Sequence, residues 1–129
     1  MVSSTDPRVL AANKIDKYFW MITENEYDEL RTITGCEVLA DLNATIKDSE
    51  HVLRLAKSLG VPESNMYITH GPTIKDLKAT YMSILKMSKK KTAAEEPHMI
   101  FVYIGGHGAT HCEKQIFLLN SADPGSAMF

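Results

Sequence analysis

Cysteine and long apolar runs are both scarce in this chain. Its 129 residues include two cysteines, Cys36 and Cys112, and no apolar stretch long enough to span a bilayer. No membrane-spanning helix is therefore expected, because such a helix needs about 20 mostly apolar residues in a row. The first ten residues, MVSSTDPRVL, lack the apolar core of a secretory signal. We therefore expect a cytoplasmic protein whose two thiols stay reduced.

An excess of positive charge is also absent. The formal net charge is −2 and the pI is about 6.2, which does not suit a general nucleic-acid binder. The lysines at 89–91 are offset by Glu95 and Glu96, so residues 88–97 are expected to form a solvated linker. With 44% apolar residues, the chain can bury the core of one small domain. We assign residues 17–129 to that domain and residues 1–16 to a flexible lead-in.

Short apolar runs alternate with helical stripes along the domain. Runs bounded by turn residues predict strands at 18–23, 65–69, 99–104 and 115–119. Apolar residues at helical spacing predict one helix over 46–59 and another that begins after Thr73. Helices between successive strands indicate right-handed crossovers and a mostly parallel sheet. The predicted fold is an α/β class, three-layer α/β/α sandwich.

The ends of the predicted helices can also be assigned. Asn43 or Thr45 is a candidate N-cap for the first helix. Thr73 and Asp76 have the spacing of a capping box, in which each side chain accepts a hydrogen bond from the other residue's amide. Residues 24–30, between the first strand and the first helix, are acidic and polar and are expected to form a loop.

The run FVYIGGHGAT, residues 101–110, is the strongest functional signal. A buried strand that ends in Gly-Gly-His-Gly puts His107 just beyond its carboxyl end, where α/β sheets bind their ligands. Histidine acts as a general base near neutral pH, and cysteine is its usual nucleophilic partner in intracellular thiol hydrolases. The N–H of Gly108 is a candidate donor to a developing oxyanion.

Other interpretations of these residues stay open. The segment is also compatible with a plain glycine-rich turn. A dinucleotide-type loop fits less well, because His111 stands where the third glycine belongs. A zinc site of His107, His111 and Cys112 lacks a fourth ligand at suitable spacing. Cys112 itself lies in a polar connection where nothing activates its thiol, so we interpret it as a surface residue.

In their order along the chain, these elements resemble the large-subunit half of the caspase-like cysteine peptidases, most closely metacaspases and paracaspases. The matching pieces lie within residues 17–124 and read YFWMIT, IKDSEHVLRLAKSLG, NMYITHGPTIKDL, FVYIGGHGAT and IFLLNSADP. The resemblance implies a caspase-like fold that lacks its C-terminal part, with His107 as the catalytic base and Gly108 as the oxyanion donor. It also implies that Asp48 lines a pocket for a basic side chain, while the helix dipole equally favours a carboxylate at a helix start. Glu24 and Asp28 are further candidates for the border of that pocket.

The family's nucleophilic cysteine has no counterpart in this chain. In the family it follows the histidine by roughly 40–60 residues, whereas 22 residues follow His107 here. We therefore expect a chain that is inactive alone and that pairs with the small-subunit segment of the fold or with another copy. The expected substrate is a peptide or protein. Cleavage after Arg or Lys is favoured over cleavage after Asp, because residues 32–46 contain no Arg or Lys to bind an acidic side chain.

Two other classes of function remain open. The chain is alternatively a non-catalytic interaction or regulatory module, or an α/β domain that binds a small anionic ligand at residues 105–108. No cofactor and no metal site are predicted. Calcium activation is common in metacaspases, but the sequence holds no calcium-binding loop.

Overall fold

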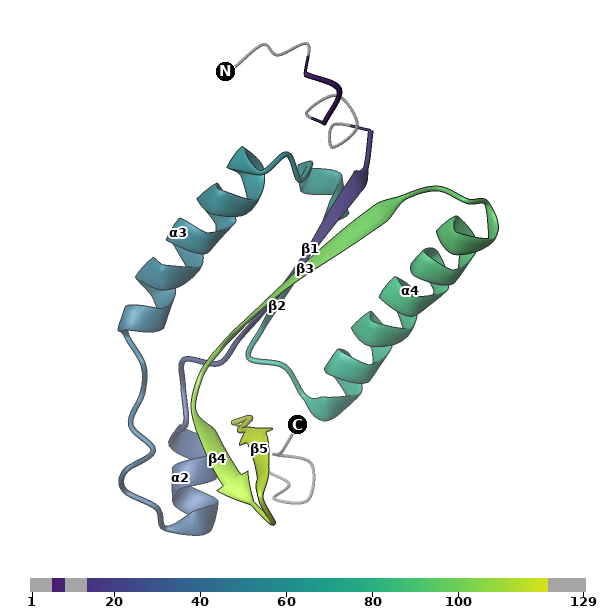
Figure 1. Cartoon of the computed structure of the whole chain (residues 1–129). Coiled ribbons are helices and arrows are strands. Elements are labelled where there is room, and N and C mark those ends of the chain that lie inside the picture. Colours follow the sequence, from purple (N-terminus) through teal and green to yellow (C-terminus); the bar gives the residue numbers. More distant parts are fainter. Residues whose placement is uncertain (1–5, 9–13, 121–129) are drawn as a thin grey trace.

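The computed structural model describes residues 6–8 and 14–120, which form an α/β fold (Figure 1). Its elements are β1 (Asp16–Thr23), α2 (Asp28–Thr34), α3 (Ala44–Ser58), the 3-10 helix η1 (Glu63–Asn65), β2 (Met66–His70), α4 (Ile74–Ala93), β3 (His98–Gly105), β4 (Gly108–His111) and β5 (Lys114–Phe117). None of the described helices is both long and apolar enough to cross a membrane. Most of the predicted lead-in at 1–16, and residues 121–124 of the IFLLNSADP match, fall outside the described residues.

Three parallel strands form the central sheet in the order β2-β1-β3. Trp20 of β1 lies opposite Tyr67 of β2 and Val102 of β3. Figure 1 shows α3 and α4 on opposite sides of this sheet, which gives three layers. The predicted α/β class, the parallel sheet and the first three predicted strands are thereby confirmed.

The central strand β1 is buried on both faces, because successive side chains of a strand point to opposite sides of the sheet. Trp20 and Ile22 pack with Leu77 and Ile84 of α4. Phe19 and Met21 lie in a second cluster, with Ala56 and Val61, on the α3 side. Full burial of one such apolar side chain contributes about 1.5–3 kcal/mol, so β1 holds the two helical layers together.

Helix α4 is longer than the sequence pattern predicts. The linker expected at 88–97 is wrong over its first part, because α4 continues to Ala93. Lysine is a good helix former, and two contacts hold the last turns in place. Ser88 Oγ lies 2.6 Å from Nε2 of His98, and Lys91 Nζ donates to carboxylates of Asp16 and Glu96 at 2.5 and 3.2 Å. The predicted capping box of Thr73 and Asp76 is present at the other end.

Two further expectations need correction. The predicted fourth strand does not join the parallel sheet, since β5 pairs antiparallel with β4 in a separate two-stranded sheet. Cys112 and Glu113 form the turn between them with positive φ angles of 50° and 64°, as a tight hairpin requires. The loop predicted for 24–30 ends early, because α2 begins at Asp28.

For α3, the candidate N-cap Asn43 is confirmed, although its side chain makes no capping hydrogen bond.

Candidate functional site

The candidate site lies where the carboxyl ends of β1 and β3 meet. The connection from β1 to β2 runs through α3, and the connection from β2 to β3 runs through α4 on the opposite face. Open α/β sheets bind their ligands at the carboxyl ends of the strands where such a reversal occurs. The N–H of Glu24 donates to the carbonyl of Gly105 at 2.9 Å, which joins the two strand ends.

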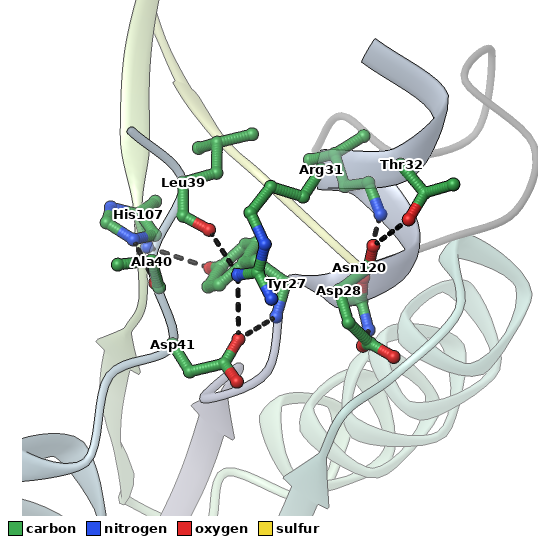
Figure 2. A network of polar contacts seen from close by, with 10 residues as sticks. Tyr27, Asp28, Arg31, Thr32, Leu39, Ala40, Asp41, His107 and Asn120 are labelled. Carbon is green, nitrogen blue, oxygen red and sulfur yellow. Dashed lines mark hydrogen bonds and ion pairs between the residues drawn. The ribbon is translucent and has the colours of Figure 1, made fainter. Parts of the chain in front are cut away.

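His107 is held at this end of the sheet by two segments from the first third of the chain. Its Nε2 lies 2.8 Å from the carbonyl oxygen of Ala40, and its backbone N–H donates to the Tyr27 hydroxyl at 2.8 Å (Figure 2). A carbonyl can only accept a hydrogen bond, so Nε2 carries the proton and Nδ1 of the neutral ring is left with its lone pair. The imidazole is therefore oriented, with Nδ1 as the nitrogen that can take a proton.

Tyr27 is the centre of the contacts around His107. Its side chain is fully buried and meets the imidazole edge-on, with ring centroids 4.7 Å apart. Its hydroxyl accepts from the His107 amide and donates to the carbonyl of Leu118 at 2.9 Å, while its own amide donates to Asp41 at 2.9 Å. Burial raises the pKa of Tyr27 to about 12, so the hydroxyl keeps its proton at neutral pH.

We predict that Tyr27→Phe lowers the free energy of unfolding by about 2–3 kcal/mol, because the His107 N–H and the Leu118 carbonyl both lose their partner. Urea denaturation monitored by circular dichroism measures this change. Tyr103→Phe is the matched control, since the Tyr103 hydroxyl makes no hydrogen bond within the described part of the chain, and it should change the value by less than about 0.5 kcal/mol. Equal values for the two variants would contradict the assigned role of Tyr27.

The N–H of Gly108 points away from the hairpin. The Leu118 amide donates to the His107 carbonyl at 2.9 Å, and Gly108 lies opposite Phe117 in the register. In an antiparallel pair, a hydrogen bond between the flanking residues His107 and Leu118 makes Gly108 and Phe117 a non-hydrogen-bonded pair. The N–H groups of Gly108 and Phe117 therefore donate no hydrogen bond between β4 and β5. The Gly108 N–H is thus directed outward, one residue beyond the histidine.

Gly106 has a different role from Gly108, because its position is closely packed. A Cβ there would lie 2.5 Å from Cε2 of Phe117 and 2.6 Å from the Tyr27 hydroxyl. A Cβ at Gly108 would meet its nearest neighbour, the carbonyl oxygen of Ile116, at 3.5 Å. Gly106 therefore allows Phe117 and Tyr27 to pack closely against the backbone. The element that follows the glycine run is the strand β4 and not a helix. Such a loop does not offer the helix N-terminus that phosphate sites use.

The three predicted pocket acids do not lie together in one open site. Asp48 is exposed in the second turn of α3, since the helix starts at Ala44, and the helix dipole there is weaker than at the first turn. Glu24 is only 3% exposed and its carboxylate accepts from the Asn120 amide at 3.2 Å. Burial raises the pKa of Glu24. Asp28 accepts from the Asn120 side chain at 2.8 Å, so Glu24 and Asp28 both anchor the segment after β5.

Arg31 was not among the predicted site residues, although it immediately precedes residues 32–46, which contain no Arg or Lys. Its guanidinium donates to the Leu39 carbonyl at 2.6 Å and to the Asp41 carboxylate at 3.0 Å (Figure 2). These contacts hold the segment that presents the Ala40 carbonyl to His107. A cation is therefore near the site, but its charge is offset by Asp41. The sequence signal for Tyr27, Ala40 and Asp41 is weak, because they act through contacts between distant segments.

Neither cysteine is hydrogen-bonded to His107 in the described part of the chain. Cys36 is half-buried and Cys112 is exposed, and both are free thiols. The His111 side chain of the zinc interpretation lies outside the described residues, and the side chains that the structure describes include no group of three His, Cys, Asp or Glu that could hold a metal ion.

No protein-family model, curated protein or solved structure matches this chain.

Proposed function

We propose that this chain is the large-subunit part of a caspase-like cysteine endopeptidase and supplies the histidine of a cysteine–histidine pair. The observation that carries the proposal is the hydrogen bond between His107 Nε2 and the Ala40 carbonyl. It leaves Nδ1 as the proton acceptor at the carboxyl end of β3, where a third group orients the base as in other activated-nucleophile sites. The nucleophilic cysteine comes from a segment that pairs with β3.

In this mechanism Nδ1 of His107 removes the proton from the cysteine thiol, and the thiolate attacks the scissile carbonyl carbon. The Ala40 carbonyl accepts from Nε2–H throughout and so stabilises the imidazolium that forms. The outward N–H of Gly108 donates to the oxyanion. The imidazolium then returns its proton to the leaving amine, and water hydrolyses the acyl-enzyme with His107 again as base.

The outer edge of β3 supports the need for a further segment. This strand pairs with β1 on one side, and no strand in the described part of the chain covers its other side. Val102 and Ile104 on this strand are 53% and 49% exposed. An exposed apolar edge favours the addition of another strand, and uncovered it is an aggregation risk. We propose that the small-subunit segment of the fold, or a second copy of this chain, covers this edge.

Cleavage after Arg or Lys is the proposed specificity. The positive charge of Arg31 is offset by its pairing with Asp41, while Asp48 is exposed and makes no ion pair within the described residues. Asp48 is therefore an exposed acid that a basic side chain of a substrate could pair with. The alternative of a small anionic ligand at residues 105–108 has less support, because β4 rather than a helix follows the glycine run and no helix N-terminus is offered to an anion.

The test is a peptidase assay on the chain expressed together with the segment encoded downstream. Fluorogenic peptides that end in Arg, Lys or Asp are compared at equal concentration. We expect cleavage after Arg and Lys at least about tenfold faster than after Asp, since one charge-assisted pairing contributes about 1.5–3 kcal/mol. The chain alone should be inactive. No cleavage of any peptide by the extended protein would contradict the proposal and favour a non-catalytic interaction module.

A further inference from the structure

Helix α4 carries most of the positive charge of this acidic protein. Its 20 residues contain six lysines and a single acid, Asp76, for a formal charge of +5. Because the whole chain has a net charge of −2, the other residues carry −7 together. The residues once expected to form a loop at 88–93 are helical, so their lysines are fixed on one element instead of being dispersed in solvent.

Five of these lysines share one face of the helix. At 100° per residue, they lie within about a third of the helix circumference, opposite the core residues Leu77 and Ile84. This basic face, all of it exposed, consists of Lys75, Lys78, Lys86, Lys89 and Lys90. None of the five makes an ion pair with another described residue. Lys91 differs, since it is half-buried and paired with Asp16 and Glu96.

Apolar hollows lie between the lysines of the basic face. One of about 430 Å³ is bordered by Met82, Leu85 and the stems of Lys86 and Lys89. A second, of about 610 Å³, lies further along the helix and is bordered by Met87, Ala94 and Glu96, whose carboxylate is paired with Lys91. Met82 is 59% exposed in the middle of the face. A ligand that fits this surface therefore has carboxylates for the lysines and apolar side chains for the hollows.

We propose that the basic face of α4 binds an acidic peptide segment of another protein, one with apolar side chains interspersed among its carboxylates. Charge complementarity between the lysines and a negatively charged ligand carries this proposal. The apolar hollows favour a peptide over a nucleic acid, because a nucleic acid would offer the lysines its phosphates but has no aliphatic side chains to fill the hollows. A lipid surface fits less well, because the apolar stripe of α4 is already buried against the sheet and cannot enter a bilayer. The surface is distinct from the His107 site and does not depend on peptidase activity.

The test measures binding of a fluorescein-labelled peptide of glutamates with leucine at every third position, by fluorescence anisotropy at about 0.1 M salt. The triple variant K86Q/K89Q/K90Q should bind it roughly tenfold more weakly or worse. The matched variant K14Q/K47Q/K114Q removes the same charge from exposed lysines elsewhere and should change the affinity by less than about twofold. Circular dichroism controls for folding, and single substitutions replace the triple variant should it not fold.

Three further probes decide between ligand classes. The same peptide with glutamine in place of glutamate should not bind. Tighter binding of a thymidine oligonucleotide, or of phosphatidylcholine–phosphatidylserine vesicles, than of the acidic peptide would overturn the proposal in favour of nucleic acid or membrane. It would also be overturned by no binding of the acidic peptide, or by an equal loss in both triple variants, which would indicate an effect of net charge alone.

Discussion

Replacing His107 with alanine is expected to lower kcat/KM of the extended protein by at least about 1,000-fold, because the thiol then loses its general base. The free energy of unfolding should fall by no more than about 1–2 kcal/mol, since the side chain makes one hydrogen bond and one ring contact. Peptidase kinetics and urea denaturation on the same preparation separate the two effects.

Two variants sharpen this experiment. His107→Gln keeps a side-chain N–H that can reach the Ala40 carbonyl but has no proton-accepting nitrogen, so it should be as inactive as the alanine variant. His51→Ala removes an exposed histidine of α3 and should leave the rate within about twofold. Full activity in His107→Ala would disprove the assigned base and, with it, the proposed mechanism.

Gly106→Ala is expected to destabilise the fold by about 3 kcal/mol, at the upper end of the range for overpacked cores. The new methyl group would overlap the Phe117 ring and the Tyr27 hydroxyl, both held by neighbouring structure. Relief requires movement of the β4–β5 hairpin or of Tyr27, and either movement displaces His107. Chemical denaturation measures the change.

Gly108→Ala is the matched control, two residues away in the same run. Its methyl group has ordinary contact distances, so a change below about 1 kcal/mol is expected. Similar stabilities for the two alanine variants would show that the close packing around Gly106 is not a constraint on this fold.

The parts of the fold that the sequence predicted are those determined by local patterns. Alternating and continuous apolar runs marked β1, β2 and β3, and the spacing of Thr73 and Asp76 marked the start of α4. The position of His107 directly after β3 followed from the same pattern, but the predicted burial of that strand on both faces is wrong, because β3 lies at the edge of the described sheet and its Val102 and Ile104 are about half exposed. Each of these features depends on residues within a few positions of one another.

The features that were missed depend on contacts between distant residues. Helix α2 has no capping side chain at Tyr27, and the amide of Leu30 donates instead to Asn120 Oδ1 at 2.9 Å, 90 residues further along the chain. The orientation of His107 likewise comes from Ala40, 67 residues earlier. No local pattern encodes such pairings. The seven-residue helix α2, whose apolar residues have weak helical periodicity, was therefore predicted to be a loop.

The cap that Asn120 provides has a consequence for the order of folding. Leu118 and Asn120 bond to Tyr27, Leu30 and His107, so the candidate site is complete only after the last described residues have reached the first quarter of the chain. Closing a segment of this length is entropically unfavourable until the sheet has brought its ends together. We infer that β1, β2 and β3 assemble first and that the histidine is oriented last. Amide exchange should accordingly release the Leu30 and His107 amides before those of β1.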